Sequence, residues 1–332
     1  MELIHANENL EEIGYITQID KFDGEISQEL KATVESNSFS LTVTDSAWRA
    51  SPICEGHYVY IPNTEWGGQV EQLRHSTAAG QVTLSGVTWR GMIYRKVIEP
   101  PAMATHLVIS GEANAAIKRI MGNTLGLFAV SAEDSGIAVS RSFRYYNMLI
   151  GIQEMLASSG AALEIAFDQK IRGVRLLARA IVDYSQRIDL SQDYGVDMVT
   201  TVGGFNRYNH IIALGAGELE DRDILHVYRL DDGTITTDVP AWAGTMKDHV
   251  RTYDYNNPES VEKLREGAEE LLAGFAPLHT IEIDPGVAGL DLKMGDKVGA
   301  RDRLIGMTGI VTVIGKVLTM DDNGIKTETR VG

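Results

Sequence analysis

The sequence predicts a β-rich α+β protein: two related β-barrel domains, with an α+β insert between them and a helix within the second barrel segment. Three observations lead to this fold class. Short alternating strand patterns, separated by turn residues, occupy both ends of the chain. Helical periodicity appears in the middle, and the glycine-punctuated pattern of residues 55–86 returns at residues 294–332. We expect a first barrel over 1–100, an insert over 101–183 and a second barrel over 184–332.

The first barrel is predicted from half-buried strands. Residues 39–44 alternate apolar and polar side chains, as a strand with one face in a core does. Residues 58–61 and 82–88 behave likewise. Turn residues separate these runs, at Asp23-Gly24, Pro62-Asn63, Gly67-Gly68 and Ala79-Gly80. Many short strands with regular turns are typical of a barrel or sandwich.

The insert is predicted from a change of period after Pro100-Pro101. Residues 112–121 and 147–159 carry apolar side chains at helical spacing, and glycines at 122 and 160 end both runs. Strand patterns follow at residues 162–167 and 174–182. The order of helix and strand patterns in this segment therefore predicts a small α+β domain.

The second barrel is predicted from strands that resume after residue 196. Residues 198–202, 210–214 and 225–230 have strand patterns, and Asp231-Asp232-Gly233 is a hairpin turn. A helix over residues 258–273 is expected to begin with Asn257 as N-cap and Pro258 at its first position. Near the end of the chain, Asn323-Gly324 predicts a type I′ hairpin.

The repeat that relates the two barrels consists of matched glycines and valines. We match Gly56 to Gly295 and Val59 to Val298. Two further glycine pairs follow in the same order, Gly68 with Gly309 and Gly80 with Gly324. The spacing between partners grows along the chain, as longer loops in the second copy would produce. A duplicated β module indicates a scaffold before it indicates an enzyme.

Charge and cysteine content limit the classes of partner. The 332 residues carry a formal net charge of −16, so we expect no tight binding to phosphate backbones or anionic lipids. Cys54 is the single cysteine, so no intramolecular disulfide is expected. The chain opens with an acidic segment and has no apolar run of about 18 residues. We therefore expect a soluble protein without membrane insertion, made in a cytoplasm.

Motifs for catalysis, cofactors and metals fail in their spacing. Gly215-Ala-Gly217 begins like a dinucleotide fingerprint, but Glu220 stands where a third glycine belongs. Residues 309–316 have the wrong glycine spacing for a P-loop, and residues 122–126 lack the serine of a nucleophile elbow. The eight histidines form no zinc-binding pair, and residues 321–324 lack the ligands of a calcium loop. We predict no catalytic, cofactor-binding or metal-binding residues and no cofactor.

Two weaker signals remain open. Glu218, Glu220 and Asp221 could flank a sugar bond in a glycan-acting hydrolase, although a solvated loop explains such a cluster in an acidic chain. Trp66 lies in the polar turn NTEWGG and is the candidate interface residue; burial under its own loop is the alternative. A carbohydrate-binding module is the related alternative function.

The order of several short motifs extends over nearly the whole chain. A strand pair over residues 26–44 precedes Gly56-His-Tyr-Val59, Gly68-Gln-Val70 and a strand that ends in residues 89–93. An asparagine-led strand at 207–215 and closing strands at 294–298 and 309–311 follow. In this order the sequence resembles the baseplate hub proteins of long-tailed bacteriophages. That family includes late control protein D and the hub part of contractile secretion-system spikes.

The resemblance implies a structural virion protein at the tail tip or baseplate. Two similar barrels per subunit would let a homotrimer form a pseudo-hexameric ring that matches the sixfold tail. Its expected partners are hexameric distal tail or tail tube proteins, and spike, fibre or receptor-binding proteins. DNA would pass through the ring without specific binding. The chain stops soon after the predicted second barrel, so we do not expect lytic activity from it, and we expect assembly in the bacterial host cytoplasm.

Overall fold

The computed structural model describes residues 2–28, 35–122, 126–191, 197–202, 208–217, 222–255, 260–275, 279–284 and 292–332. The chain divides into two compact units, Met1–Val199 with Ile281–Gly332, and Thr200–Thr280. Strands outnumber helices, which confirms the predicted β-rich α+β class. The sheets described here have free ends and do not close into barrels. The grouping into domains 1–100, 101–183 and 184–332 stays a prediction.

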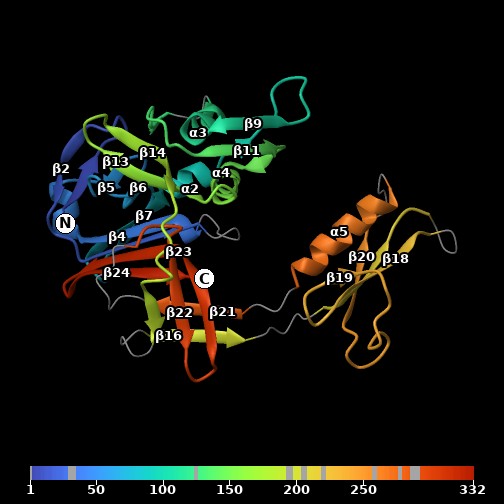
Figure 1. The fold of residues 1–332 in the computed structure, drawn as a ribbon. Coiled ribbons are helices and arrows are strands. Elements are labelled where there is room, and N and C mark those ends of the chain that lie inside the picture. The colour runs from blue at the N-terminus through green and yellow to red at the C-terminus, as the bar shows by residue number, and fades with distance from the viewer. Residues whose placement is uncertain are drawn as a thin grey trace. The chain divides into compact units, whose positions relative to one another are not determined.

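An 11-stranded sheet organises the larger unit (Figure 1). Its path runs β15-β22-β23-β3-β4-β7-β6-β5-β1-β2, and β24 pairs with β23 beside this path. The N-terminal strands are β1 (Leu3–Ala6), β2 (Glu12–Ile16), β3 (Lys21–Ser27), β4 (Ser38–Thr44), β5 (Tyr58–Tyr60), β6 (Gly67–Ser76) and β7 (Gln81–Thr88). The later strands are β15 (Asp189–Ser191), β22 (Lys297–Asp302), β23 (Met307–Asp321) and β24 (Gly324–Val331).

The two ends of the chain meet in this sheet. Strand β23 pairs antiparallel with β3, from Gly315 opposite Ser27 to Asp321 opposite Lys21. Alternate side chains of the sheet, among them Phe22, Leu41 and Leu318, are completely buried in one core. The N-terminal and C-terminal modules therefore share a sheet and a hydrophobic core.

Short helices begin at threonines that end strands. Helix α1 (Asp45–Ala50) follows β4, and the Thr44 hydroxyl accepts a hydrogen bond from the Ala47 N–H. Helix α2 (Trp89–Tyr94) follows β7, and Thr88 caps it in the same way through Gly91. The prediction that residues 89–93 end a strand is therefore wrong, because the Thr88 cap turns the chain into a helix. The 3₁₀ turn η1 (Glu35–Asn37) precedes β4.

The segment after residue 96 forms the predicted α+β insert elements. Helix α3 (Ala113–Met121) ends at Gly122, whose φ is +47°, and helix α4 (Met148–Ala157) begins after the cap Asn147. Both predicted helices are confirmed. Around them lie β8 (Val97–Ile98), β9 (Leu107–Glu112), β10 (Phe128–Val130), β11 (Ala138–Phe143), β12 (Tyr146–Asn147), β13 (Ala161–Asp168) and β14 (Gly173–Ala180). Strands β13 and β14 confirm the strand patterns predicted at residues 162–167 and 174–182, and they pair antiparallel.

The smaller unit is a four-stranded sheet covered by one helix. The strands are β17 (His210–Leu214), β18 (Ile224–Arg229), β19 (Ile235–Thr236) and β20 (Val250–Asp254). Helix α5 (Val261–Ala273) buries Leu264, Ala268 and Leu272 against Ile211 and Val227. Its N-cap is Ser260; the expected cap Asn257 and first residue Pro258 lie outside the described residues. Strands β16 (Asp197–Val202) and β21 (His279–Asp284) form a separate pair.

None of the described helices has the length and apolar character needed to cross a membrane.

Candidate functional site

The hairpins β5–β6 and β22–β23 repeat the same backbone arrangement. Gly56 and Gly295 precede the first strand of each hairpin with φ of +86° and +87°. The Gly56 N–H donates to the Val70 carbonyl and the Val70 N–H to the His57 carbonyl, both at 2.8 Å. In the second hairpin, Gly295, Val313 and Asp296 make the same two bonds at 2.8 Å. The equivalence predicted for the two glycines is therefore present in the fold.

Each hairpin then has a β-bulge at the same place. The pairing of β6 with β7 shifts register between Val70 and Gln72. The pairing of β23 with β24 shifts between Val313 and Gly315, which are the matching positions. A bulge bends the strand and increases its twist, so both copies turn away from their first strand in the same manner. The repeat extends through three strands in each copy.

The register corrects two of the predicted glycine matches. Val59 pairs with Gly68, whereas the equivalent Val298 pairs with Val311. Gly68 therefore corresponds to Val311 and not to Gly309. The match of Gly80 with Gly324 fails because the turn between Ser76 and Gln81 is longer than the turn between Asp321 and Gly324. The hairpin predicted at Asn323-Gly324 is confirmed as the β23–β24 hairpin. Its turn is not type I′, because that type needs a positive φ and Asn323 does not have one.

The repeated turn holds different neighbours in its two copies. His57 meets the buried His5, with 2.8 Å between His5 Nε2 and His57 Nδ1. Asp296, at the equivalent position, accepts from the Arg179 guanidinium at 2.8 Å and from the Val182 N–H at 3.1 Å. The first copy thus contacts β1 and the second copy contacts the end of β14.

Trp66 lies beside a cleft of about 320 Å³ within the larger unit. Its side chain is 8% exposed and packs in the core of the large sheet. The turn before it is fixed to β13, because the Asn63 N–H donates to the Phe167 carbonyl and the Phe167 N–H to the Thr64 carbonyl, each at 2.9 Å. The candidate interface residue is thus mostly buried, and its role in an interface stays a prediction.

Charged side chains around this cleft pair with one another. Arg90 is completely buried and holds the Glu65 carboxylate with Nε and Nη2, while Nη2 also donates to the Leu163 carbonyl at 3.0 Å. On the other wall, Glu164 contacts Lys293 at 3.0 Å and Arg179 at 3.4 Å. Both carboxylates therefore have cationic partners, and these pairs connect segments that are far apart in the sequence; burial nevertheless raises the pKa of Glu65 in spite of the neighbouring Arg90.

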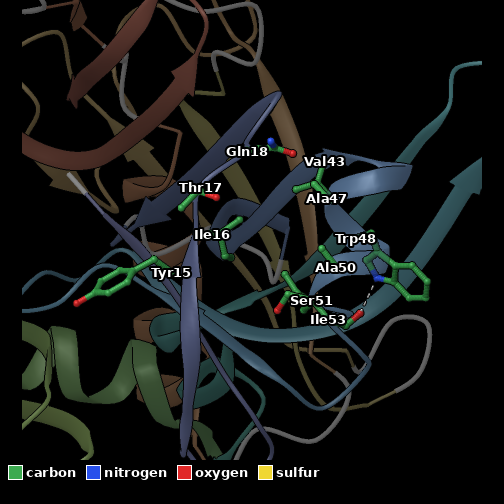
Figure 2. A pocket seen from close by; sticks show the side chains of 10 residues that line it. All are labelled: Tyr15, Ile16, Thr17, Gln18, Val43, Ala47, Trp48, Ala50, Ser51 and Ile53. Carbon is green, nitrogen blue, oxygen red and sulfur yellow. Dashed lines mark hydrogen bonds between the residues drawn. The ribbon is translucent and has the colours of Figure 1, made fainter.

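A second pocket of about 220 Å³ opens between β2 and α1 (Figure 2). Trp48 forms one wall, and its indole N–H donates to the Ile53 carbonyl at 3.1 Å. Ile16 and Val43 line the pocket, and Tyr15 lies on the far side from Trp48. The lining is mainly apolar, which suits a hydrophobic side chain.

The smaller unit contains a histidine cluster that sequence spacing did not indicate. His210 Nδ1 lies 2.9 Å from Asp248, and His210 Nε2 lies 2.8 Å from His226 Nδ1. The Tyr228 ring stacks on His210 with 4.3 Å between ring centroids. These residues come from two strands and a loop, so only the sheet register brings them together. In the described residues no group of three His, Cys, Asp or Glu could hold a metal ion.

The remaining motifs have structural roles where the structure describes them. Gly309 lies inside β23, so residues 309–316 form a strand and not a phosphate loop. The Gly215 N–H donates to the Asp223 carbonyl at 2.7 Å, which makes this glycine part of a turn. The carboxylates Glu218, Glu220 and Asp221 lie outside the described residues.

No protein-family model and no curated protein matches the sequence. The fold is similar to three solved tail proteins. A tail protein of Neisseria meningitidis MC58 has 14% identity and a TM-score of 0.55, covering 99% of this chain and 95% of its own. The 43 kDa tail protein of prophage MuSo2 from Shewanella oneidensis has 13% identity and a TM-score of 0.58, with 100% and 98% coverage. A prophage tail protein from Listeria monocytogenes has 13% identity and a TM-score of 0.52, with 99% and 94% coverage.

At such identities the similarity establishes a shared fold over nearly the whole chain. Fold alone does not determine function, since function depends on the surfaces and sites that a fold presents.

Proposed function

We propose that this chain is a structural protein of a phage tail, placed at the tail tip or baseplate hub. The main support is the hairpin and bulge that occur twice in one chain, in a fold similar to those of three solved tail proteins, two of which come from prophages. Three subunits with two similar modules each could present six similar surfaces to a sixfold tail. The domain grouping 1–100, 101–183 and 184–332 belongs to this proposal.

The proposed ring joins the tail to its distal parts. Hexameric distal tail or tail tube proteins would bind one side, and spike, fibre or receptor-binding proteins the other. The net charge of −16 supports passage of DNA without binding, because phosphate binding depends on cations that release counterions. The protein would be made in the host cytoplasm and assembled into the virion.

The alternative function, a glycan-acting hydrolase, has less support than a structural role in the tail. A glycosidase needs one carboxyl group able to donate a proton and a second one positioned across the sugar bond. Glu65 and Glu164 flank the cleft near Trp66, but Arg90, Arg179 and Lys293 pair with them. We therefore propose a mechanical function and no catalytic residues.

The proposal is tested by the size and shape of the purified chain and by its place in the virion. Light scattering after size exclusion should give the mass of a trimer, and negative-stain images should show a ring. Gold-labelled antibody should mark the tail end of particles. A monomeric chain that degrades peptidoglycan or a defined glycan would contradict the proposal.

A further inference from the structure

The two repeated hairpins differ in which of their strand edges is occupied. In the second repeat, residues 315–319 of β23 lie between β24 on one side and β3 on the other. In the first repeat, the equivalent residues 72–76 of β6 pair with β7, and no described strand pairs with their other edge. Strand β7 lies between β6 and β4, whereas the equivalent β24 has β23 as its single partner among the described strands. Each repeat therefore has one open edge whose counterpart is occupied in the other repeat.

The alternation of hydrogen bonds identifies the backbone groups at the open edge of β6. The Asp45 N–H donates to the Gly80 carbonyl at 2.9 Å, in register with the pairing of β4 with β7. Every second residue of β7 from Gly80 onwards therefore bonds to β4, and the residues between them, such as Thr83, bond to β6. Leu73 and His75 lie on either side of the β6 residue that pairs with Thr83. They consequently direct their N–H and C=O groups to the open edge.

The equivalent backbone groups of the second repeat are paired with β3. The Gln28 N–H donates to the Ile314 carbonyl at 2.8 Å, in register with the pairing of β3 with β23. The same alternation places further bonds of β23 to β3 at Lys316 and Leu318. When the two bulges are aligned, these residues correspond to the two outward-facing residues of β6. The first repeat thus offers a strand the same row of groups that β3 occupies in the second.

The open edge of β6 also leaves apolar surface uncovered. In the second repeat, Leu318 and Met320 are 0% and 8% exposed. On the same face of the first repeat, Leu73 is 40% exposed. Together with His75 and Trp48 it lines a pocket of about 180 Å³. Strand addition commonly combines backbone pairing with a pocket for one side chain, so this edge has both features of an acceptor.

A strand pair at the matching place in the chain is available for the two open edges. Strands β3 and β4 pair with each other, are the last strands before the turn of Gly56, and connect β23 to β7. Strand β21 is the last strand before the turn of Gly295, and its partner β16 precedes the strands of the smaller unit. The β16–β21 pair has no other partner among the described strands. It therefore corresponds to the β3–β4 pair in chain position and in pairing.

We propose that β16 of one copy adds to the open edge of β6 in a second copy, while β21 pairs with β24 of its own chain. This contact repeats between subunits the connection that β3 and β4 make between the two hairpins of one subunit. The inference rests on the proposed function, since it supplies the contact for the ring. The β6 and β16 surfaces differ, so the contact is heterologous and its repetition can close a ring. The open edge of β2 takes no part, because β2 lies outside the repeated strands.

The first test removes one outward N–H from β6. Leu73→Pro deletes this donor and leaves the bonds to β7 in place, because proline is tolerated where the N–H of a strand faces outward. The matched control Leu73→Val keeps the N–H. Light scattering after size exclusion should give a trimer for wild type and L73V and at least a tenfold weaker association for L73P. Circular dichroism verifies that L73P keeps its fold.

The second test traps the contact and distinguishes among the open edges. Two differently tagged chains, both with Cys54→Ser, are produced together. One carries Val199→Cys on β16, where the valine is 61% exposed, and the other carries a single cysteine at one of positions 72–76. Oxidation should yield a covalent heterodimer with at least one of these positions. Ile13→Cys on the edge of β2 and Lys118→Cys on α3 should yield none.

The outcomes separate the strand contact from the ring itself. A trimer that L73P leaves intact and that no cysteine of β6 traps overturns the contact with β6 but not the ring. A crosslink of Val199→Cys to Ile13→Cys in place of β6 has the same meaning. A chain that stays monomeric at every concentration overturns both the contact and the ring.

Discussion

Gly56 and Gly295 adopt the same left-handed backbone conformation at the same point of two hairpins, with φ of +86° and +87°. Each donates its N–H to a valine that precedes a β-bulge. The surroundings of the two glycines nevertheless differ. A Cβ on Gly56 would meet nothing within 4 Å, whereas a Cβ on Gly295 would lie 2.7 Å from the Ala162 Cβ. The first turn thus has open space beside its glycine, whereas the glycine of the second turn is packed against β13.

The difference predicts unequal costs for the same substitution. Gly56→Ala should lower the free energy of unfolding by about 1–2 kcal/mol, the cost of a left-handed alanine. Gly295→Ala should lower it by about 2–4 kcal/mol, because overpacking against Ala162 is added to the same backbone strain. Urea denaturation followed by near-ultraviolet circular dichroism measures both values. Equal losses would show that β13 can move away from the turn.

The repeat could be found in the sequence only where backbone conformation restricts the residue. A positive φ favours glycine, so Gly56 and Gly295 are visible as a match. Gly68 and Val311 occupy equivalent positions with different residues. At Gly68 the added Cβ would lie 1.9 Å from the Val87 carbonyl oxygen, a close approach specific to the first copy. The spacing of residues in the sequence does not show where a bulge lies or how long a turn is. The predicted matches of Gly68 with Gly309 and of Gly80 with Gly324 are therefore out of register.

Glu112 predicts an acid-dependent stability. Burial opposes its ionisation, but hydrogen bonds from the Ser135 hydroxyl and from the N–H groups of Asn114, Ala115 and Ser135 prevail and lower the pKa of Glu112 to about 2. Because this pKa is lowered from 4.5, the stabilisation is complete above pH 4.5 and is lost as the pH falls toward 2. Glu112→Gln should cost about 1 kcal/mol at pH 7, as expected for a helix N-cap.

The measurement is a series of urea unfolding curves between pH 7 and pH 2. The difference between wild type and Glu112→Gln should shrink below pH 4.5. Glu133→Gln, at an exposed acid in the same region, should leave the curve unchanged. A constant difference at all pH values would mean that the Glu112 charge does not contribute.

Helices of this insert were predictable because their apolar spacing extends over nine or ten residues in α3 and α4. Helix α2 has six residues, too few for a period, and only its Thr88 cap distinguishes it from a continued strand. The His210, His226 and Asp248 cluster depends on cross-strand register, which sequence spacing does not encode. The polar turn around Trp66 is readable in the sequence, but it leaves both exposure and burial of this side chain open, because the burial depends on the core beneath the turn.

The buried pair of Arg90 and Glu65 predicts a large loss on removing one partner. Arg90→Met leaves the Glu65 carboxylate without its cation in a site where Glu65 is 13% exposed and Arg90 fully covered. We expect a loss of about 3–5 kcal/mol. The double variant Arg90→Met with Glu65→Leu should recover at least about 2 kcal/mol of this loss, because no unpaired charge is then buried.

A neighbouring pair of the same chemistry provides the control. Arg95 and Glu71 also form an arginine–glutamate contact, but their side chains are 44% and 35% exposed. Arg95→Met should therefore change the free energy of unfolding by about 0–1 kcal/mol. Similar losses for Arg90→Met and Arg95→Met would show that burial does not strengthen the contribution of the Arg90–Glu65 pair.

His5 predicts a second pH dependence in a different range. Burial, and then the neighbouring His57, lower the pKa of His5 from 6.5 to about 4. Above pH 6.5 the ring is neutral in both the folded and the unfolded chain. As the pH falls from 6.5 to 4, His5 becomes protonated in the unfolded chain but stays neutral in the folded chain. The free energy of unfolding therefore decreases by up to about 1.4 kcal/mol per pH unit.

The variant His5→Gln should flatten the dependence of the free energy of unfolding on pH in this range, and His106→Gln, at an exposed histidine, should not. Since the Glu112 effect begins below pH 4.5, unfolding curves at pH 7, 6 and 5 isolate the His5 contribution. An unchanged slope in His5→Gln would assign the pH dependence to another group.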